Sequence, residues 1–217
     1  MATRVAHFQQ GLIDQLPAGF TLWRGLVEPA MQTRLVELAR DLCRRAPLIQ
    51  PRTRFSTNFK LKLTSWGDVG WLSDEQGYRY EPVHPETRQP WPAIPADVRA
   101  VMMKASAAAG YPGFDLQTVL VNFYERDAGK LGLHQDKTEK NLRAPIVTIS
   151  LGDSCIFGIG GLYHSDPVQE IVLDSGDVLV QGGPARMFFH EVMRLLPGSS
   201  NLLRQGGRIS MTGRTYI

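Results

Sequence analysis

The sequence has little cysteine and no long apolar segment, and each absence excludes a class of protein. Its 217 residues include two cysteines, Cys43 and Cys155, which form no C-x-x-C pair. A disulfide framework and a thiolate zinc site are therefore excluded as organising features. No apolar run approaches the roughly 18 residues that a membrane helix needs, and the first residues lack the apolar centre of a signal peptide. We expect a cytoplasmic protein without membrane contact.

Internal repeats, low-complexity tracts and a Gly/Ser linker are also missing from the sequence. With 43% hydrophobic residues, a chain of this length can bury one sizeable core. We therefore expect a monomer with a single catalytic domain over residues 1–217. Its formal net charge of +3 is compatible with a polyanionic partner but does not require one.

Two amphipathic helices are expected in the first half of the chain. The first begins at Pro29, which suits a first helical turn, and carries apolar residues at spacings of four, three and four: Met31, Leu35, Leu38 and Leu42. The second begins near Pro95 and ends at Gly110.

Between these helices, residues 52–91 are irregular and rich in Gly, Pro and aromatic residues. Basic side chains at spacings of two suggest a strand with one wet face, which either contacts phosphates or is simply solvated: Arg52, Arg54, Lys60 and Lys62. Several aromatic residues follow, and they form either a small subcore or a platform for stacking flat rings: Trp66, Trp71, Tyr78, Tyr80 and Trp91.

From residue 117 the pattern changes to short strands separated by Gly, Asp and Pro turns. We expect strands at Thr118 to Tyr124, Ile146 to Leu151, Cys155 to Gly158, Gln169 to Leu173, Asp177 to Val180, Met187 to Val192 and Arg208 to Tyr216. Their spacing indicates a sandwich or jelly roll with a cavity between its sheets, braced by the N-terminal helices.

Three residues offer the ligands for one metal ion. His134 and Asp136 stand two apart, so on one strand they face the same way, and His190 lies on a later strand that can return to them. Two imidazoles and a carboxylate form the facial triad of non-heme Fe(II) oxygenases. The same donors suit a zinc hydrolase, and His134 alone reads equally well as a structural histidine.

Two polar strand faces accompany these ligands. Arg208 and Arg214 share one face of a strand and can grip both carboxylates of a dicarboxylic acid, while Ile209 and Met211 take the opposite face. Asn122 and Tyr124, again two residues apart, can add hydrogen bonds; alternatively, both pairs are ordinary strand surface.

Taken together, these motifs closely resemble the AlkB family of Fe(II)/2-oxoglutarate dioxygenases. The resemblance runs in order over about residues 50–217, through Asn122-Phe123-Tyr124, His134-Gln135-Asp136-Lys137, Leu142-Arg143-Ala144-Pro145, Phe189-His190 and the two arginines, and it includes Gly70-Trp71 and Gln76-Gly77-Tyr78-Arg79-Tyr80. It implies a double-stranded β-helix core over about 117–217, with a nucleotide-recognition lid over about 50–92. It also implies oxidative removal of N-alkyl groups from bases of single- or double-stranded DNA, with RNA as a further substrate.

The resemblance assigns roles to individual residues. It makes His134, Asp136 and His190 the iron ligands, with O2 as co-substrate, and it gives 2-oxoglutarate four contacts: Asn122, Tyr124, Arg208 and Arg214. It gives the substrate six contacts: Trp71, Tyr78, Arg79, Tyr80, Thr138 and His164.

Two of these substrate positions depart from the bacterial AlkB pattern. Thr138 stands where that pattern has an acidic residue that contacts the damaged base, and His164 replaces an arginine; Gln181 and Ser210 differ as well. Substrate preference is therefore less determined than reaction type. The alternatives are the same oxidation of a tRNA base or a protein side chain, and a noncatalytic nucleic-acid-binding jelly roll.

Overall fold

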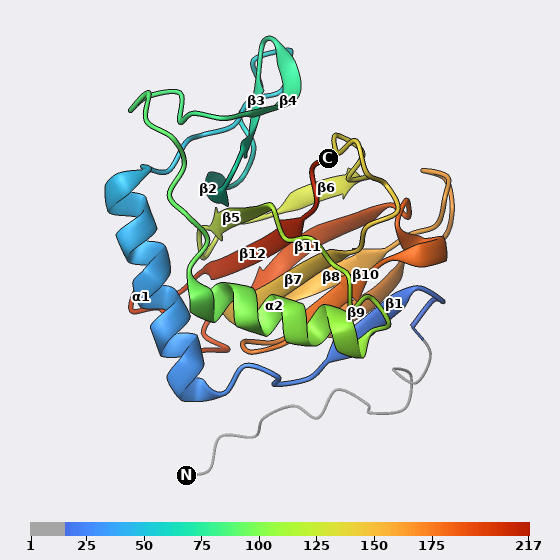
Figure 1. Ribbon diagram of the computed structural model, residues 1–217. Coiled ribbons are helices and arrows are strands. Elements are labelled where there is room, and N and C mark those ends of the chain that lie inside the picture. The colour runs from blue at the N-terminus through green and yellow to red at the C-terminus, as the bar shows by residue number, and fades with distance from the viewer. Residues whose placement is uncertain (1–15) are drawn as a thin grey trace.

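A computed structural model describes residues 16–217, and in it two antiparallel sheets face each other (Figure 1). The six-stranded sheet runs in the order β1 (Phe20–Trp23), β10 (Val178–Gln181), β7 (Ile146–Gly152), β12 (Arg208–Arg214), β5 (Thr118–Tyr124) and β2 (Lys62–Gly67). The four-stranded sheet runs in the order β6 (Leu131–His134), β11 (His190–Leu196), β8 (Ser154–Ile159) and β9 (Gln169–Leu173). This mainly β architecture confirms the expected jelly-roll class.

Side chains alternate across the six-stranded sheet and divide the core in two. On β12, Ile209 and Met211 belong to a hydrophobic cluster shared with the helices. Arg208, Ser210 and Arg214 point the opposite way, into a cavity that the other sheet also lines. A second cluster, which includes Leu120 of β5 and Phe157 of β8, packs between the two sheets. One face of β12 is thus structural and the other is free for chemistry.

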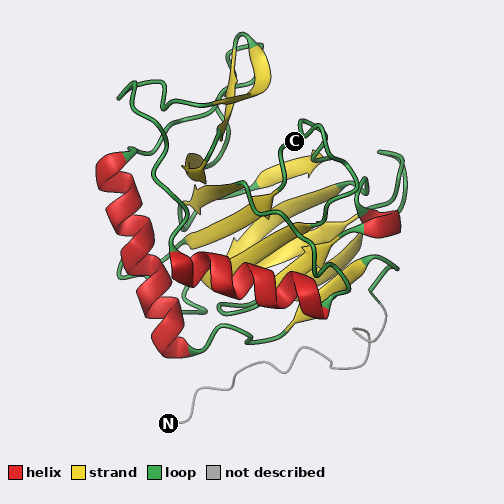
Figure 2. Ribbon diagram, in the orientation of Figure 1, coloured by secondary structure: helices red, strands yellow, loops and turns green. Residues whose placement is uncertain are grey.

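The helices α1 (Pro29–Arg45) and α2 (Ala96–Ala108) pack against the outer face of the six-stranded sheet, as Figure 2 shows. Both were expected, and the second ends just before Gly110, which has a positive φ of 92°. At Gly213 of β12, an added Cβ would meet the sulfur of Met102, so the glycine lets α2 approach the strand that carries Arg214. Within residues 16–217, no helix has the length and apolar character needed to cross a bilayer.

Several strand boundaries differ from the prediction. The strand expected from Met187 begins only at His190, because Phe188 donates its amide to Ala185 in a turn that continues the 3-10 helix η1 (Gly183–Ala185). The basic strand expected around Lys60 becomes regular only at Lys62, although Leu61 and Leu63 are both buried. Two further features were not predicted: β1 and the hairpin of β3 (Gly70–Asp74) and β4 (Gly77–Glu81).

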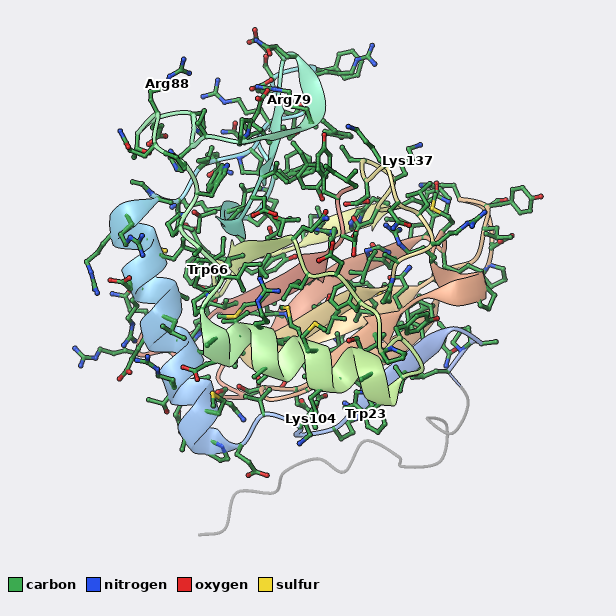
Figure 3. The ribbon with its side chains drawn as sticks, in the orientation of Figure 1. Trp23, Trp66, Arg79, Arg88, Lys104 and Lys137 are labelled. Atoms are coloured by element: carbon green, nitrogen blue, oxygen red, sulfur yellow. The ribbon has the colours of Figure 1, made fainter. Side chains whose placement is uncertain are left out.

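The β3–β4 hairpin projects beyond the sheets (Figure 1). Its turn passes through Gly77, whose φ is 93°. The Arg79 guanidinium closes the hairpin on itself by pairing with Asp74 at 2.7 Å and Glu81 at 2.8 Å. In Figure 3, Arg79 and Lys137 lie at the same end of the molecule, opposite Lys104 and Trp23. This end carries the candidate site.

Candidate metal and co-substrate site

His134, Asp136 and His190 meet at one point between the strands. Their potential ligand atoms all lie within 4.8 Å of one another. His134 Nε2 is 3.7 Å from one carboxylate oxygen of Asp136, and His190 Nε2 is 4.0 Å from the other. The structure therefore brings together the three residues predicted as ligands, in an arrangement that can hold a metal ion.

The expectation that one strand carries both His134 and Asp136 was wrong. β6 ends at His134, and Asp136 lies in the irregular segment that follows. The two histidines instead face each other across β6 and β11, where His190 pairs directly with His134. Strand pairing, which links distant parts of the chain, thus sets the distance between the imidazoles.

Each imidazole is held in the tautomer that a metal requires. Nδ1 of His134 lies 2.8 Å from the carbonyl oxygen of Gly132, and Nδ1 of His190 lies 3.3 Å from that of Phe188. Because a carbonyl oxygen only accepts hydrogen bonds, each Nδ1 carries the proton. The Nε2 lone pairs are then directed at the shared point, as in metal-binding histidines whose other nitrogen donates to a carbonyl.

Electrostatics keep the carboxylate charged and the buried imidazole neutral. Burial would raise the Asp136 pKa, but the charge of Arg214, aided by the two histidines, outweighs it and holds that pKa well below its usual range. The Arg214 Nη2 donates to Asp136 at 2.6 Å. Burial, together with the neighbouring imidazole of His134, lowers the pKa of His190 to about 4. Near neutral pH these are the protonation states of metal ligands.

The four residues predicted to contact 2-oxoglutarate line the same cavity. Opposite one another on β12 and β5 are Arg208 and Tyr124, then Ser210 and Asn122. Tyr124 is fully enclosed, and burial raises its pKa, so it remains a neutral hydroxyl. The cavity has a volume of about 570 Å³.

Buried hydrogen-bond donors without partners indicate which kind of ligand this cavity can bind. Arg208 donates one bond to Ser150 Oγ at 2.7 Å, while its Nε and Nη1 have no partner among the described residues. Arg214 Nη1 is likewise unpaired within residues 16–217. A buried guanidinium with unused donors calls for an anion with acceptor oxygens, and a dicarboxylate supplies them at both ends. The residues present therefore fit both 2-oxoglutarate and the metal beside it.

Only some of the residues predicted to bind substrate line the cavity. Trp71 and Tyr78 line the cavity from the hairpin with ring centroids 5.5 Å apart, and the Trp71 Nε1 donates to Thr138 Oγ1 at 3.4 Å. Arg79, held within the hairpin, and Tyr80 are not part of the cavity lining. His164 lies on an exposed loop with its ring against Phe189.

Sequence reasoning gave no role to Glu139, which is buried beside the site. Its carboxylate pairs with Arg186 at 3.1 Å and with Arg214 at 3.3 Å, and it accepts the hydroxyl hydrogen of Tyr80. Arg186 also donates to the backbone oxygen of Asp136 at 2.6 Å. A charged residue three positions after a ligand is not in itself a signal of burial, so only the fold reveals this network.

Comparison with known proteins bears on the site as a whole. A family model described as the 2OG-Fe(II) oxygenase superfamily matches residues 19–214. The Alpha-ketoglutarate-dependent dioxygenase AlkB homolog of Caulobacter vibrioides is 42% identical over 196 residues, which cover 90% of this chain and 87% of that protein. The Alpha-ketoglutarate-dependent dioxygenase AlkB of Escherichia coli is 40% identical over 185 residues, which cover 85% of each chain. The chain belongs to the AlkB family of 2OG-Fe(II) oxygenases.

A solved AlkB-family structure shows the same fold. The structure of OsALKBH1 matches with a TM-score of 0.80 and 27% identity, covering 93% of this chain and all of that one. The AlkB-family chain is accordingly an Fe(II)- and 2-oxoglutarate-dependent dioxygenase, which confirms the expected enzyme class and its need for Fe(II), 2-oxoglutarate and O2. The roles assigned to individual residues of this AlkB-family site stay predictions.

Proposed function

We propose that this enzyme oxidatively removes N-alkyl groups from nucleobases such as 1-methyladenine and 3-methylcytosine in DNA. One observation carries the proposal: the metal-ligand cluster, the arginine face and two hairpin aromatics, Trp71 and Tyr78, line a single cavity. The relatives support the substrate class, since proteins named nucleic acid dioxygenase and DNA N(6)-methyladenine demethylase are among them.

In this proposal each set of side chains has a separate task. His134, Asp136 and His190 hold Fe(II), and the arginine face with Asn122 and Tyr124 holds 2-oxoglutarate. The bound iron, with 2-oxoglutarate and O2, supplies the oxidation that hydroxylates the N-methyl carbon and yields succinate, CO2, an aldehyde and the restored base. The protein contributes placement, because it fixes the reacting groups in one geometry.

The hairpin aromatics take the target base. A base drawn out of a helix loses its stacking neighbours and needs a flat surface to replace them. Trp71 and Tyr78 present such surfaces at the edge of the cavity. A methylated cationic base pairs poorly, so it leaves the stack at lower cost than a normal base. We therefore assign residues 50–92 to a substrate lid and residues 117–217 to the catalytic core of one domain.

The test is aldehyde release from methylated single-stranded DNA, measured with succinate formation. We expect both products in equal amounts from the wild type and neither from His134→Ala. A panel of methylated DNA and RNA oligonucleotides, analysed by mass spectrometry, then shows whether the enzyme acts on DNA or on RNA. Wild-type enzyme that forms no aldehyde from any nucleic acid in the panel would contradict the proposal and favour a protein side chain as substrate.

The cellular setting and assembly state belong to the same proposal. Cys43 and Cys155 are both free thiols, as suits a reducing compartment. We propose a cytoplasmic monomer, to be checked by cell fractionation and by light scattering.

A further inference from the structure

Gln181 is a buried polar side chain to which the proposed function gives no role. It is the last residue of β10, is 4% exposed and lines the catalytic cavity. Its backbone is fixed on both sides, because Phe20 of β1 and Ile146 of β7 pair with it in the six-stranded sheet. The side chain therefore extends from a rigid part of the core.

The Gln181 amide can take only one orientation. Its Nε2 donates to the carbonyl oxygen of Ala185 at 2.9 Å and to that of Phe188 at 3.3 Å. Because carbonyl oxygens only accept hydrogen bonds, the NH2 group and not Oε1 must face them. The Gln181 amide is thus directed at the segment that leads from η1 into β11.

The Phe188 carbonyl oxygen is shared between Gln181 and a predicted iron ligand. His190 Nδ1 donates to the same oxygen, also at 3.3 Å. A carbonyl oxygen has two lone pairs, so these two donors together use both of them. A single oxygen atom therefore joins Gln181 to the imidazole of His190.

The two histidines differ in how their carbonyl partners are held. The partner of His134 is Gly132, which lies within β6, so the strand itself fixes this carbonyl. Phe188, the partner of His190, lies in no helix or strand, because β11 begins only at His190. The Phe188 carbonyl therefore needs support from outside a regular element.

Two contacts supply that support to the peptide between Phe188 and Phe189. On its amide side, Phe189 donates to the carbonyl oxygen of Gly161 at 2.8 Å, and Gly161 itself belongs to a loop. On its carbonyl side, Gln181 connects the peptide to the paired strands of the core. The Gln181 contact is thus the one that fixes the carbonyl to the sheet.

We propose that Gln181 is a positioning residue for the iron site. It holds the Phe188 carbonyl in the orientation that keeps the proton of His190 on Nδ1 and directs Nε2 at the metal. Residues that support a metal-binding imidazole in this way typically change metal affinity by about 10–100-fold. The inference rests on the part of the proposed function that makes His190 an iron ligand, and it is independent of which substrate the enzyme oxidises.

Two glutamines of this chain allow a matched comparison. Gln181→Met removes the amide donor but leaves each of the two carbonyls its other donor, so the variant should fold. Gln32 of α1, on the outer face of the six-stranded sheet, also donates through Nε2 to two carbonyl oxygens, those of Val27 at 2.8 Å and Ser175 at 3.5 Å. Gln32→Met is therefore the same substitution away from the cavity.

Fe(II) affinity is measured by anaerobic calorimetry without 2-oxoglutarate or nucleic acid. We expect Gln181→Met to bind Fe(II) about tenfold more weakly than the wild type, and Gln32→Met to bind it within about twofold. Nitrogen NMR of the imidazole rings in the metal-free proteins gives a second measurement. His190 should carry its proton on Nδ1 in the wild type and in Gln32→Met, and should be a mixture of both tautomers in Gln181→Met.

Each outcome decides the inference. Wild-type Fe(II) affinity or a single His190 tautomer in Gln181→Met would overturn it, as would an equal loss of affinity in Gln32→Met. If Gln181→Met does not fold, Gln181→Asn, whose amide is one methylene shorter, takes its place with the same expectations.

His190→Ala, measured in the same experiment, separates this inference from the proposed function. Unchanged affinity in His190→Ala would overturn the ligand set and the role of Gln181 with it. Lost affinity in His190→Ala beside wild-type affinity in Gln181→Met would overturn the role of Gln181 alone. Absence of demethylation would count against the proposed substrate only, because no substrate enters these measurements.

Discussion

The hydroxyl of Tyr80 donates a hydrogen bond to the carboxylate of Glu139, 59 residues further along the chain. This contact joins the projecting hairpin to the segment that follows the metal ligands. Glu139 also pairs with Arg214, which in turn binds Asp136. Only two side chains, those of Glu139 and Arg214, thus lie between Tyr80 of the hairpin and Asp136, the predicted iron ligand.

Removing the Tyr80 hydroxyl should loosen the hairpin. Tyr80→Phe deletes one hydrogen bond to a buried charged acceptor and should lower the free energy of unfolding by about 1–3 kcal/mol. Hydrogen exchange should become faster in β3 and β4. The control is Tyr78→Phe, in which the hydroxyl lost comes from a side chain that is largely exposed on the same hairpin. Equal urea midpoints for the two variants would contradict the role given to Tyr80.

Neutralising Glu139 should weaken the binding of 2-oxoglutarate more than the binding of the methylated base. Glu139→Gln keeps the shape but leaves Arg186 and Arg214 with one buried carboxylate fewer, a change that costs about 3–5 kcal/mol in buried pairs. Because Arg214 then loses one of its two anchors, we expect the KM for 2-oxoglutarate to rise by more than the KM for methylated DNA. Steady-state kinetics with each substrate varied in turn measure the difference. A rise confined to the KM for DNA would show that Glu139 acts on the lid alone.

The sequence predicts elements and polar faces better than the contacts between them. Strand β5 and both helices follow from local periodicity, and the two faces of β12 follow from alternation. The hairpin was missed because its strands are short and its sequence, with Gly77 and several polar residues, lacks alternation. The burial of Glu139 depends on Arg186 and Tyr80, which approach it from two distant segments. Contacts between distant segments leave no signal in the local sequence pattern.

The metal site should depend on all three predicted ligands. His190→Ala should weaken Fe(II) binding by more than about 100-fold, since loss of an outer contact alone costs about 10–100-fold. Anaerobic calorimetry measures this affinity directly. His164→Ala removes an exposed histidine that lies outside the cluster and should bind Fe(II) as the wild type does. If both variants keep wild-type affinity, the iron is held elsewhere.

Arg208 should favour 2-oxoglutarate binding but lower the free energy of unfolding of the ligand-free protein. It is 1% exposed and has two unpaired donor nitrogens, so Arg208→Met should raise the free energy of unfolding of the ligand-free protein by about 1–3 kcal/mol. The same change should abolish the rise in melting temperature that 2-oxoglutarate produces in the wild type. Thermal scans with and without 2-oxoglutarate test both statements. A destabilised Arg208→Met protein would mean that the guanidinium is satisfied within the fold.

Thr138 should set the preference between charged and neutral bases. Its hydroxyl accepts a hydrogen bond from Trp71 at the cavity, so an acid at this position would face a bound base. Thr138→Asp should raise the preference for cationic 1-methyladenine over neutral 3-methylthymine about tenfold, the equivalent of about 1.4 kcal/mol. The control is Thr138→Asn, because asparagine has the size of aspartate without its charge. If Thr138→Asn changes the ratio of kcat/KM values for the two bases as much as Thr138→Asp does, the shape of the side chain and not its charge sets the preference.

The direct pairing of His190 with His134 also determines when the metal site can exist during folding. One imidazole arrives with β6 and the other with β11, and Arg214, which binds Asp136, lies 78 residues from it in the chain. Contacts between such distant segments form late, after loop closure has been achieved. A partly folded chain therefore lacks the predicted site, so we expect Fe(II) to bind only the completed double sheet. By mass action the iron then stabilises every part of that sheet, so saturating Fe(II) should restore folding to destabilised variants far from the cavity.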